Sequence, residues 1–261
     1  MKDFVFKKKF GQNFLSDKNL LKAICADAGV DAQSEVLEIG AGAGSLTEVL
    51  AESAKKVVSF EIDRDLQEQL LGLGLANVEF VFDDFMNRSM QEVEDMFAGG
   101  FKVVANLPYY ITTPIIFKLL EESERVESLT IMVQKEVAEK ICSKVGDKDY
   151  GIPTVMTSFY GNAKITRIVN RHMFFPAPNV DSAILHIEIE RDKFVGIDKK
   201  KFSKFVKACF AMRRKTLLNN LGAVYNKIRL KELLGEETLA RRAESFSLEE
   251  FVELFKKCQT I

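Results

Sequence analysis

The sequence has few of the residues that build metal centres, disulfide frameworks and hydrolytic triads. Its 261 residues include only two histidines and four cysteines. The cysteines are widely spaced with no C-x-x-C pair, which predicts reduced, mostly buried thiols instead of disulfides or a zinc site. Neither histidine has a carboxylate at ligand spacing, so we expect no metal centre, and a Ser-His-Asp hydrolase has little support.

Long apolar runs are also missing. No stretch approaches 18 uninterrupted apolar residues, which a membrane-spanning helix needs. Residues 1–15 lack the apolar run and the small-residue cleavage site of a signal peptide. We therefore expect a cytoplasmic protein with no membrane partner. A hydrophobic content of 47% is enough to build a core.

Net charge is only -1, but the charge is unevenly distributed. From Arg191 onward there are 17 Lys and Arg against 9 Asp and Glu, whereas residues 1–190 hold 20 against 29. This asymmetry predicts an acidic main domain over residues 1–192 and a basic helical domain over residues 193–261 that could meet a polyanion. Solvated, Lys-rich helix faces would give the same count.

Short β-rich runs alternate with helical patterns through the first half of the chain. The predicted strands cover residues 36–39, 57–62, 78–82, 102–106 and 129–134. Such alternation predicts an α/β fold with a mostly parallel sheet covered on both faces. Two further strands, 163–169 and 182–190, have no helix between them and predict an antiparallel pair at a sheet edge. Residues 198–258 have helical apolar spacing.

A glycine loop, residues 38–44 with sequence EIGAGAG, joins the first predicted strand to a helix. Glycines let the backbone turn tightly, and a helix N-terminus offers free N–H groups, so Gly40 and Gly42 are candidate cofactor contacts. The second strand ends at Glu61, 17 residues after Gly44, where a carboxylate can accept hydrogen bonds from ribose hydroxyls. The third ends at Asp84. We therefore expect a nucleotide-type cofactor at the carboxyl edge of the sheet.

Two cofactors are candidates for this site, NAD and S-adenosylmethionine. NAD would use a similar loop and the same ribose carboxylate, so hydride transfer stays an alternative. The G-x-G-x-x-G spacing is absent, however, because Ser45 follows Gly44. The additional carboxylates Glu38 and Asp84 suit a ligand with an ammonium, a sulfonium and an adenine amino group, which favours S-adenosylmethionine. Each of them could instead have a structural role, Asp84 as a helix cap.

The fourth strand ends in the tetrapeptide Asn106-Leu107-Pro108-Tyr109. The exocyclic amine of adenine is a poor nucleophile because its lone pair is delocalised into the ring. Hydrogen bonds from that amine to the Asn106 amide oxygen and the Leu107 carbonyl could orient the lone pair toward a methyl donor. Pro108 fixes φ, and Tyr109 could stack on the base for about 1–3 kcal/mol. The motif predicts catalysis by positioning and electrostatics, although an ordinary turn would use similar residues.

Six motifs occur in order: GQNFL (11–15), EIGAGAG (38–44), FEIDRD (60–65), NLPY (106–109), FFPAPNVDSA (174–183) and RRKTLLNNL (213–221). Together they resemble the KsgA-type ribosomal RNA adenine dimethyltransferases from about residue 7 to the end of the chain. The resemblance implies a class I methyltransferase domain with a seven-stranded, mostly parallel sheet, and a small helical domain. It also implies transfer of four methyl groups from S-adenosylmethionine to N6 of two adjacent adenines in the 3′-terminal hairpin of small-subunit (16S) rRNA. The product would be S-adenosylhomocysteine and the partner an immature 30S subunit, acted on by a monomer during ribosome biogenesis.

The resemblance also implies residue roles. The cofactor site would consist of Asn13, the backbone of Leu15, Gly40, Glu61, Asp84 and Asn106. Asn106 to Tyr109 would be the catalytic motif, and Phe174 would pack on the opposite face of the target base from Tyr109. Without the resemblance, Phe174 is more readily interpreted as a core residue.

Two basic clusters are candidates for phosphate contacts, which give affinity without sequence information. One lies near the end of an amphipathic helix and consists of Arg213, Arg214 and Lys215. The other adjoins the first motif and consists of Lys7, Lys8 and Lys9.

One position departs from the family pattern: Tyr110 stands where many relatives have asparagine, which could alter base contacts or the second methylation. The Erm branch, which dimethylates an adenine of large-subunit rRNA, is the nearest alternative. The Gly11 opening, Leu107 and the motif at 213–221 favour the KsgA type. A chiefly non-catalytic role in ribosome assembly is a third hypothesis that the sequence leaves open.

Overall fold

A computed structural model describes residues 14–15 and 17–260. The predicted site residues Lys7, Lys8, Lys9 and Asn13 lie outside these described residues. The chain divides into two compact units: residues 1–138 with 164–189, and residues 139–163 with 190–261.

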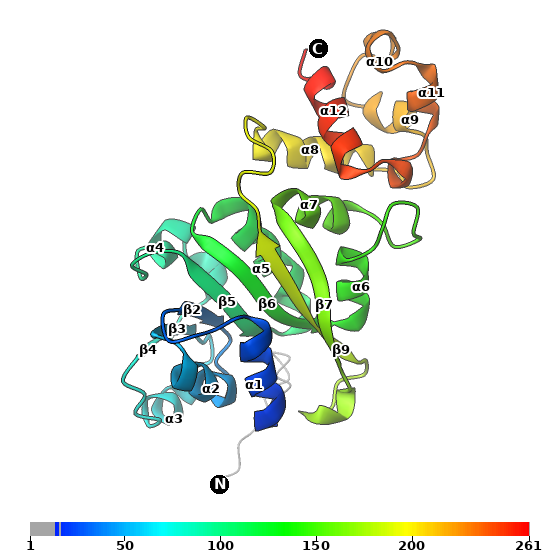
Figure 1. Ribbon diagram of the computed structural model, residues 1–261. Coiled ribbons are helices and arrows are strands. Elements are labelled where there is room, and N and C mark those ends of the chain that lie inside the picture. Colours follow the sequence, from blue (N-terminus) through cyan, green and yellow to red (C-terminus); the bar gives the residue numbers. More distant parts are fainter. Residues whose placement is uncertain (1–13, 16, 261) are drawn as a thin grey trace. The chain divides into compact units, whose positions relative to one another are not determined.

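The first unit is built on a seven-stranded sheet in the order β4-β3-β2-β5-β6-β9-β7 (Figure 1). Its strands are β2 (Glu35–Ile39), β3 (Lys56–Phe60), β4 (Val78–Val81), β5 (Phe101–Asn106), β6 (Val126–Gln134), β7 (Gly161–Val169) and β9 (Ser182–Ile189). The first five run parallel to their neighbours, and β9 runs antiparallel to β6. This is the predicted mostly parallel α/β fold of a class I methyltransferase.

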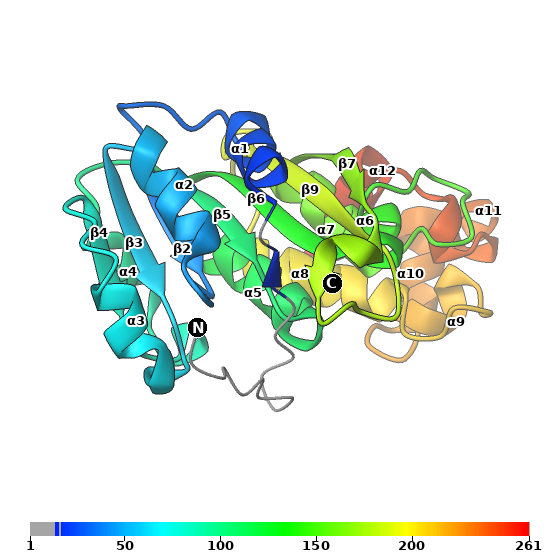
Figure 2. The ribbon, with the colours of Figure 1, turned by 90° about the horizontal axis from the view of Figure 1, so that it is seen from below.

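Helices cover both faces of this sheet, which explains why central strands such as β2 are buried along their whole length. The helices are α1 (Lys18–Asp27), α2 (Ser45–Ser53), α3 (Gln67–Leu71), α4 (Met90–Glu94), α5 (Tyr109–Glu122) and α6 (Lys135–Ile141). Figures 1 and 2 place α1 and α2 on one face and α5 on the other. The sequence predicted helical patterns after the first, second and fourth strands, where α2, α3 and α5 lie. It did not predict α1, whose buried residues are only Leu21, Ile24 and Cys25.

The strand order fixes where a ligand can bind. From β2 the chain goes outward to β3 and β4, then returns to the other side of β2 to form β5 and β6. The order therefore reverses between β2 and β5, and ligands of open α/β sheets bind at the carboxyl ends of the strands at such a point. Because β9 is antiparallel, its first residue, Ser182, pairs with Gln134 at that same edge.

The predicted pair at the sheet edge is present, since β9 and β7 are neighbours and β7 is outermost. The segment between them contains a short strand, β8 (Phe174–Phe175), which the sequence pattern did not predict. It pairs with β1 (Phe14–Leu15) in an antiparallel two-stranded sheet that sets Leu15 opposite Phe174. The 174–183 motif thus joins the N-terminal part of the chain to the sheet.

The second unit is helical. Its helices are α7 (Ile152–Tyr160), α8 (Lys199–Cys209), α9 (Leu217–Leu221), α10 (Lys227–Leu234), α11 (Glu236–Ala240) and α12 (Leu248–Cys258). The first of these comes from residues 139–163, which the expected division at 192/193 assigned to the main domain. Its Phe159 stacks on Phe202 with ring centroids 4.4 Å apart, and the Tyr150 hydroxyl donates to the Phe246 carbonyl at 2.8 Å. Packing between residues so distant in sequence leaves no local pattern from which to predict it.

Two absences hold for the described part of the chain. No helix there is long and apolar enough to span a membrane. No group of three or more His, Cys, Asp or Glu side chains among the same residues could hold a metal ion.

Candidate active site

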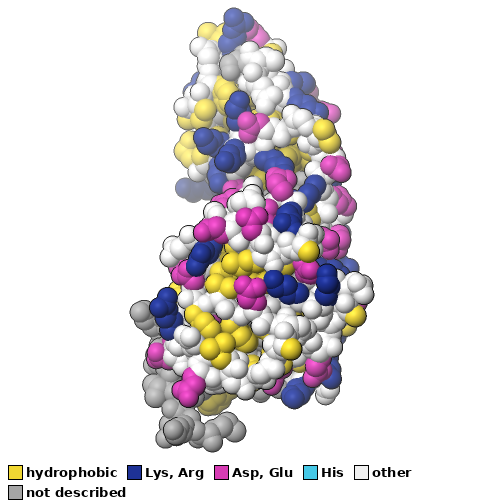
Figure 3. Space-filling view, turned by 90° about the vertical axis from the view of Figure 1, so that its left-hand side faces the viewer, with side chains coloured by type: hydrophobic (Ala, Val, Ile, Leu, Met, Phe, Trp, Pro, Cys, Tyr) yellow, Lys and Arg dark blue, Asp and Glu magenta, His cyan; other side chains and the backbone are white. Residues whose placement is uncertain are grey.

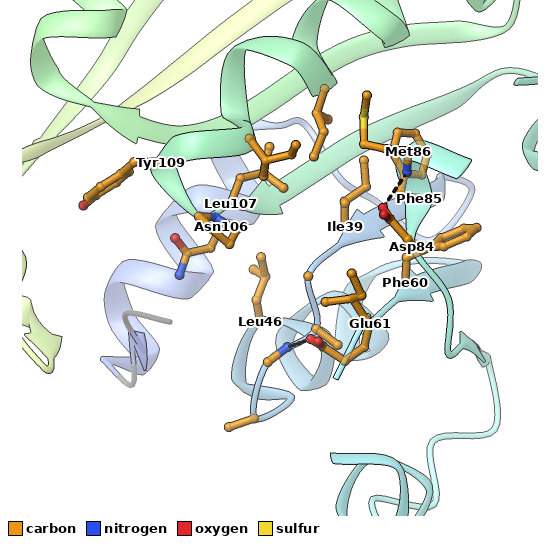
Figure 4. A pocket seen from close by; sticks show the side chains of 18 of the residues that line it. Ile39, Leu46, Phe60, Glu61, Asp84, Phe85, Met86, Asn106, Leu107 and Tyr109 are labelled. Atoms are coloured by element: carbon orange, nitrogen blue, oxygen red, sulfur yellow. Dashed lines mark hydrogen bonds between the residues drawn. The ribbon is translucent and has the colours of Figure 1, made fainter. Parts of the chain in front are cut away.

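A pocket lies at the carboxyl edge of the sheet, among the segments that follow β2, β3, β4 and β5 (Figure 4). Most of the predicted site residues within the described part of the chain line it: Leu15, Gly40, Gly42, Glu61, Asp84, Asn106, Leu107, Pro108 and Tyr109. These residues are up to 94 positions apart in the chain. Their convergence follows from the parallel strand order, which brings four carboxyl ends together.

The glycine loop needs its glycines. Gly40, Gly42 and Gly44 have φ of +82°, +56° and +88°, in the left-handed region that other residues avoid. A Cβ on Gly44 would also lie 2.6 Å from Leu73 Cδ1. The Gly40 N–H donates to the Phe60 carbonyl at 2.8 Å, which ties the loop to the end of β3. The loop is thereby held against the pocket, immediately before α2 begins.

Glu61 lies at the end of β3 with 5% of its surface exposed, and its carboxylate lines the pocket. Its Oε2 accepts a hydrogen bond from the Gly42 N–H at 2.7 Å, and its Oε1 accepts one from the Asp63 N–H at 2.7 Å. Each carboxylate oxygen can accept more than one hydrogen bond, so capacity remains for a ligand diol. Burial raises the pKa of Glu61 above its ordinary value.

Asp84 follows β4 and has the capping role that the sequence left open, at a position on the pocket wall. It caps the short helix Phe85–Asn87, because its Oδ1 accepts from the Met86 N–H at 2.9 Å, and it also lines the pocket (Figure 4). Its neighbour Asp83 also lines the pocket and is ion-paired, with Oδ2 2.7 Å from an Arg88 guanidinium nitrogen.

Glu38 does not line the pocket, which favours the structural role among the two that the sequence left open for it. It is fully buried, and its Oε2 accepts hydrogen bonds from the hydroxyls of Thr47 at 2.6 Å and Ser59 at 2.5 Å. Its Oε1 has no hydrogen-bond partner among the described residues. Burial, reinforced by the negative charge of Glu61, raises the pKa of Glu38 to about 7. Glu38 therefore links β2, β3 and α2 beneath the glycine loop.

The NLPY motif ends β5 and begins α5. Asn106 is half-buried, and its side chain lies on the pocket side of the motif (Figure 4). Pro108 precedes the first turn of α5, and its carbonyl accepts from the Ile111 N–H and the Thr112 hydroxyl, each at 3.1 Å. The Leu107 carbonyl accepts no backbone hydrogen bond from the residues that the structure describes. The Pro108 carbonyl is therefore engaged in the first turn of α5, and a ligand contact by the Leu107 carbonyl stays a prediction.

Tyr109 is anchored by a residue that the sequence reasoning did not single out. Its hydroxyl lies 2.7 Å from the Ser182 hydroxyl oxygen, and Ser182 is fully buried at the start of β9. Partial burial raises the pKa of the Tyr109 phenol. Because Ser182 belongs to the motif at 174–183, this hydrogen bond joins two of the six sequence motifs.

Phe174 is not brought to the pocket opposite Tyr109. Its ring is 5% exposed and belongs to a core cluster with Leu15, Leu21 and Val104. Phe174 does not line the pocket, whereas the adjacent Phe175 is 69% exposed. The prediction that Phe174 packs on a target base is untested by this geometry.

Apolar residues complete the pocket wall and were not predicted: Ile39, Leu46, Phe60, Ile62, Phe85 and Met86. Several of them are next in sequence to a predicted polar site residue. Their position beside the end of a strand was therefore the one signal in the sequence that could have identified them. Apolar walls beside separate carboxylates fit a ligand with an aromatic ring, a sugar diol and a positive charge.

The predicted basic cluster at residues 213–215 belongs to the helical unit, and it lies in the loop between α8 and α9 and not on a helix. Arg213, Arg214 and Lys215 are all exposed. The loop is held by Asn220, which is 1% exposed; its amide donates to the Cys209 carbonyl at 2.6 Å and its Oδ1 accepts from the Met212 N–H at 3.0 Å. Lys and Arg side chains gather over this unit on the face shown in Figure 3.

The strand order, the glycine loop, and the acids at the ends of β3 and β4 define a class I methyltransferase. The family model for ribosomal RNA adenine dimethylases matches residues 3–260. The chain belongs to that family and is an rRNA adenine dimethylase.

Similar proteins agree with this assignment over nearly the whole chain. A protein of Clostridioides difficile named ribosomal RNA small subunit methyltransferase A is 42% identical over 95% of this chain and 89% of its own length. A protein of the same name from Bacillus cereus is 44% identical over 96% of this chain and 90% of its own length. A dimethyladenosine transferase from Plasmodium falciparum has a similar structure, with a TM-score of 0.82 and 26% identity over 95% of this chain and 98% of that one. The 23S rRNA methyltransferase ErmE also has a similar structure. Its TM-score is 0.73, with 28% identity over 95% of this chain and 100% of that one.

Proposed function

We propose that this enzyme dimethylates N6 of two adjacent adenines in the 3′-terminal hairpin of small-subunit rRNA, using S-adenosylmethionine. The observation that carries the proposal is the position of Asn106 and Leu107 in the wall of a pocket that Gly40, Glu61 and Asp84 also line. The names of relatives at 42–44% identity favour the small subunit.

The pocket suits this cofactor. Glu61 would accept hydrogen bonds from the ribose hydroxyls, and Asp84 from the adenine amine. Apolar side chains such as Ile62 and Phe85 would pack on the adenine ring, and Leu15 with the glycine loop would border the amino-acid moiety. Asn13 is proposed to join them. When bound, S-adenosylmethionine supplies a methyl group made electrophilic by its sulfonium.

The acceptor adenine would be held by the NLPY motif. Its N6 amine donates hydrogen bonds to the Asn106 amide oxygen and the Leu107 carbonyl, which directs the nitrogen lone pair away from the ring. Tyr109, anchored by Ser182, stacks on one face of the base. The amine loses its proton after the nitrogen has gained positive charge, so these residues act by positioning and need no strong base.

Two further roles belong to the proposal. Phe174 would cover the second face of the base, as the family resemblance implies, and this requires its ring to turn out of the core cluster. Arg213, Arg214 and Lys215, with Lys7, Lys8 and Lys9, would contact phosphates of the rRNA within an immature 30S subunit, with the enzyme acting as a monomer.

The decisive experiment compares wild type with Asn106→Ala. Each is incubated with labelled S-adenosylmethionine and small subunits that lack adenine dimethylation, and methyl groups are mapped on the RNA by mass spectrometry. We expect dimethyladenine in the 3′ hairpin with wild type only, because alanine removes the acceptor that orients the amine. Equal transfer by both variants would refute the role of the motif.

Large-subunit rRNA is the substrate of the second candidate function, which the structural similarity to ErmE supports. A parallel incubation with unmethylated large subunits tests it: methylation there and not on small subunits would replace our proposal. A role chiefly in subunit assembly predicts a different outcome, in which Asn106→Ala still binds small subunits and rescues their maturation in cells that lack the enzyme.

A further inference from the structure

Tyr110 places an aromatic ring at the pocket with most of its surface in water. It lines the pocket, yet 65% of its surface is exposed. Its neighbour Tyr109 is only partly exposed and is fixed through Ser182. Core packing therefore accounts for little of the Tyr110 ring, which is free to meet something that arrives from solvent.

The helix geometry separates the tasks of the two tyrosines. Both lie in the first turn of α5, where successive side chains point in directions about 100° apart. Their rings therefore cannot stack on the same face of one base. When Tyr109 stacks on the base in the pocket, Tyr110 faces a different part of the same ligand, at the pocket rim.

We propose that Tyr110 is a specificity-determining residue that stacks on the nucleotide adjoining the target adenine. This inference rests on the proposed function, in which the substrate is a strand with two adjacent adenines. With one adenine in the pocket, its covalent neighbour is necessarily close to the rim. A neutral phenol ring offers a π-face to that base but no charge to a phosphate, and stacking of this kind is worth about 1–3 kcal/mol per base.

Such a contact sets the register of the RNA. A strand with an unstacked purine beside the target is held in place, whereas a strand without that neighbour is not.

The test uses unmethylated small subunits assembled with rRNA that carries 2-aminopurine next to the target adenine. Wild type, Tyr110→Phe and Tyr110→Ala are compared. We expect wild type and Tyr110→Phe to quench the fluorescence of the stacked base, and Tyr110→Ala to quench it weakly. We also expect Tyr110→Ala to raise KM for the subunit about 5- to 150-fold, which corresponds to the stacking free energy, with unchanged affinity for S-adenosylmethionine.

An abasic site at the neighbouring position is the matched control. It should raise KM for wild type to the value for Tyr110→Ala and leave that variant unaffected. Equal quenching and equal KM for wild type and Tyr110→Ala would overturn the inference, as would weakened cofactor binding by Tyr110→Ala alone. If wild type fails to methylate intact subunits, the proposed function itself fails, so the two failures are distinguishable.

Discussion

Glu38 is a fully buried carboxyl whose charged form is disfavoured by its surroundings. Because its folded-state pKa is about 7 against 4.5 when exposed, the native state binds a proton that the unfolded state releases. Its contribution to stability is complete below pH 4.5 and is lost as pH rises to 7 and above. We expect the free energy of unfolding of wild type, relative to Glu38→Gln, to fall by up to about 3 kcal/mol over this range.

Denaturant unfolding of both variants at pH 5 and pH 8 measures this difference. Exposed Glu68→Gln serves as the control for the loss of a surface carboxylate. A Glu38→Gln difference that does not change with pH would mean that Glu38 is charged in the native state.

A substitution of Phe174 can distinguish a role in core packing from a role in catalysis. Since it belongs to a core cluster, Phe174→Leu should lower the free energy of unfolding by about 1 kcal/mol. If its ring also covers the base, kcat/KM for the RNA should fall about 5- to 150-fold with unchanged cofactor affinity. Steady-state kinetics with unmethylated subunits decides: a stability loss with unaltered kcat/KM would leave Phe174 a core residue only.

Single residues also show what sequence could and could not predict. The positions of Glu61, Asp84 and Asn106 were predictable because each lies at or just after the end of a strand, and parallel strands share one carboxyl edge. For Glu38 and Phe174 the sequence left a structural and a functional role open, since the direction of a side chain near a strand end depends on the local backbone; the structure shows both side chains buried. Ser182 was missed because its partner is 73 residues away, and nothing in the sequence marks that hydrogen bond.

At the scale of elements, the glycine loop gives a prediction with a built-in control. Gly44→Ala and Gly74→Ala both put a side chain at positive φ, at +88° and +63°, which costs roughly 1–2 kcal/mol. Only at Gly44 does the new Cβ also approach Leu73 Cδ1 to 2.6 Å, whereas at Gly74 nothing lies within 4 Å. We expect Gly44→Ala to be less stable and to bind S-adenosylmethionine more weakly, measured by thermal unfolding and calorimetry. Equal effects of the two substitutions would show that steric room around the loop is unimportant.

The predicted bounds of helices and strands agreed best with the structure where a local hydrophobic pattern marked each element separately. All five predicted strands of the parallel sheet begin and end within three residues of the observed bounds. The helical stretch at 198–258 is present, but it divides into five helices, with exposed loops such as the one that Asn220 holds. Breaks of this kind depend on side-chain hydrogen bonds between separate segments, which periodicity does not contain.

For the whole molecule, the uneven charge predicts a salt-dependent affinity for RNA. Arg213→Glu with Arg214→Glu should weaken binding to small subunits and leave cofactor affinity unchanged. Because each lost phosphate contact releases one fewer counterion, the slope of log affinity against log salt should become shallower by about one to two. The matched control reverses the charges of Arg229 and Lys231 by substitution with Glu. Both residues are exposed on α10 of the same unit and are paired with Glu232 and Glu236. Unchanged binding by the first variant, or equal loss with both, would contradict the assignment of the α8–α9 loop.

The reversed direction of β9 has a consequence for the order in which the enzyme is made. By the time a ribosome has released residue 134, the nascent chain contains every described part of the proposed methyl-donor pocket, with Asn106 and Tyr109. It still lacks Ser182, the partner that fixes the Tyr109 ring, because that residue arrives at the start of the last strand. Vectorial synthesis therefore makes the strands and loops of the donor half first. Leu15, which pairs with Phe174, and Tyr109 take their final positions only after residues 174–189 have been made.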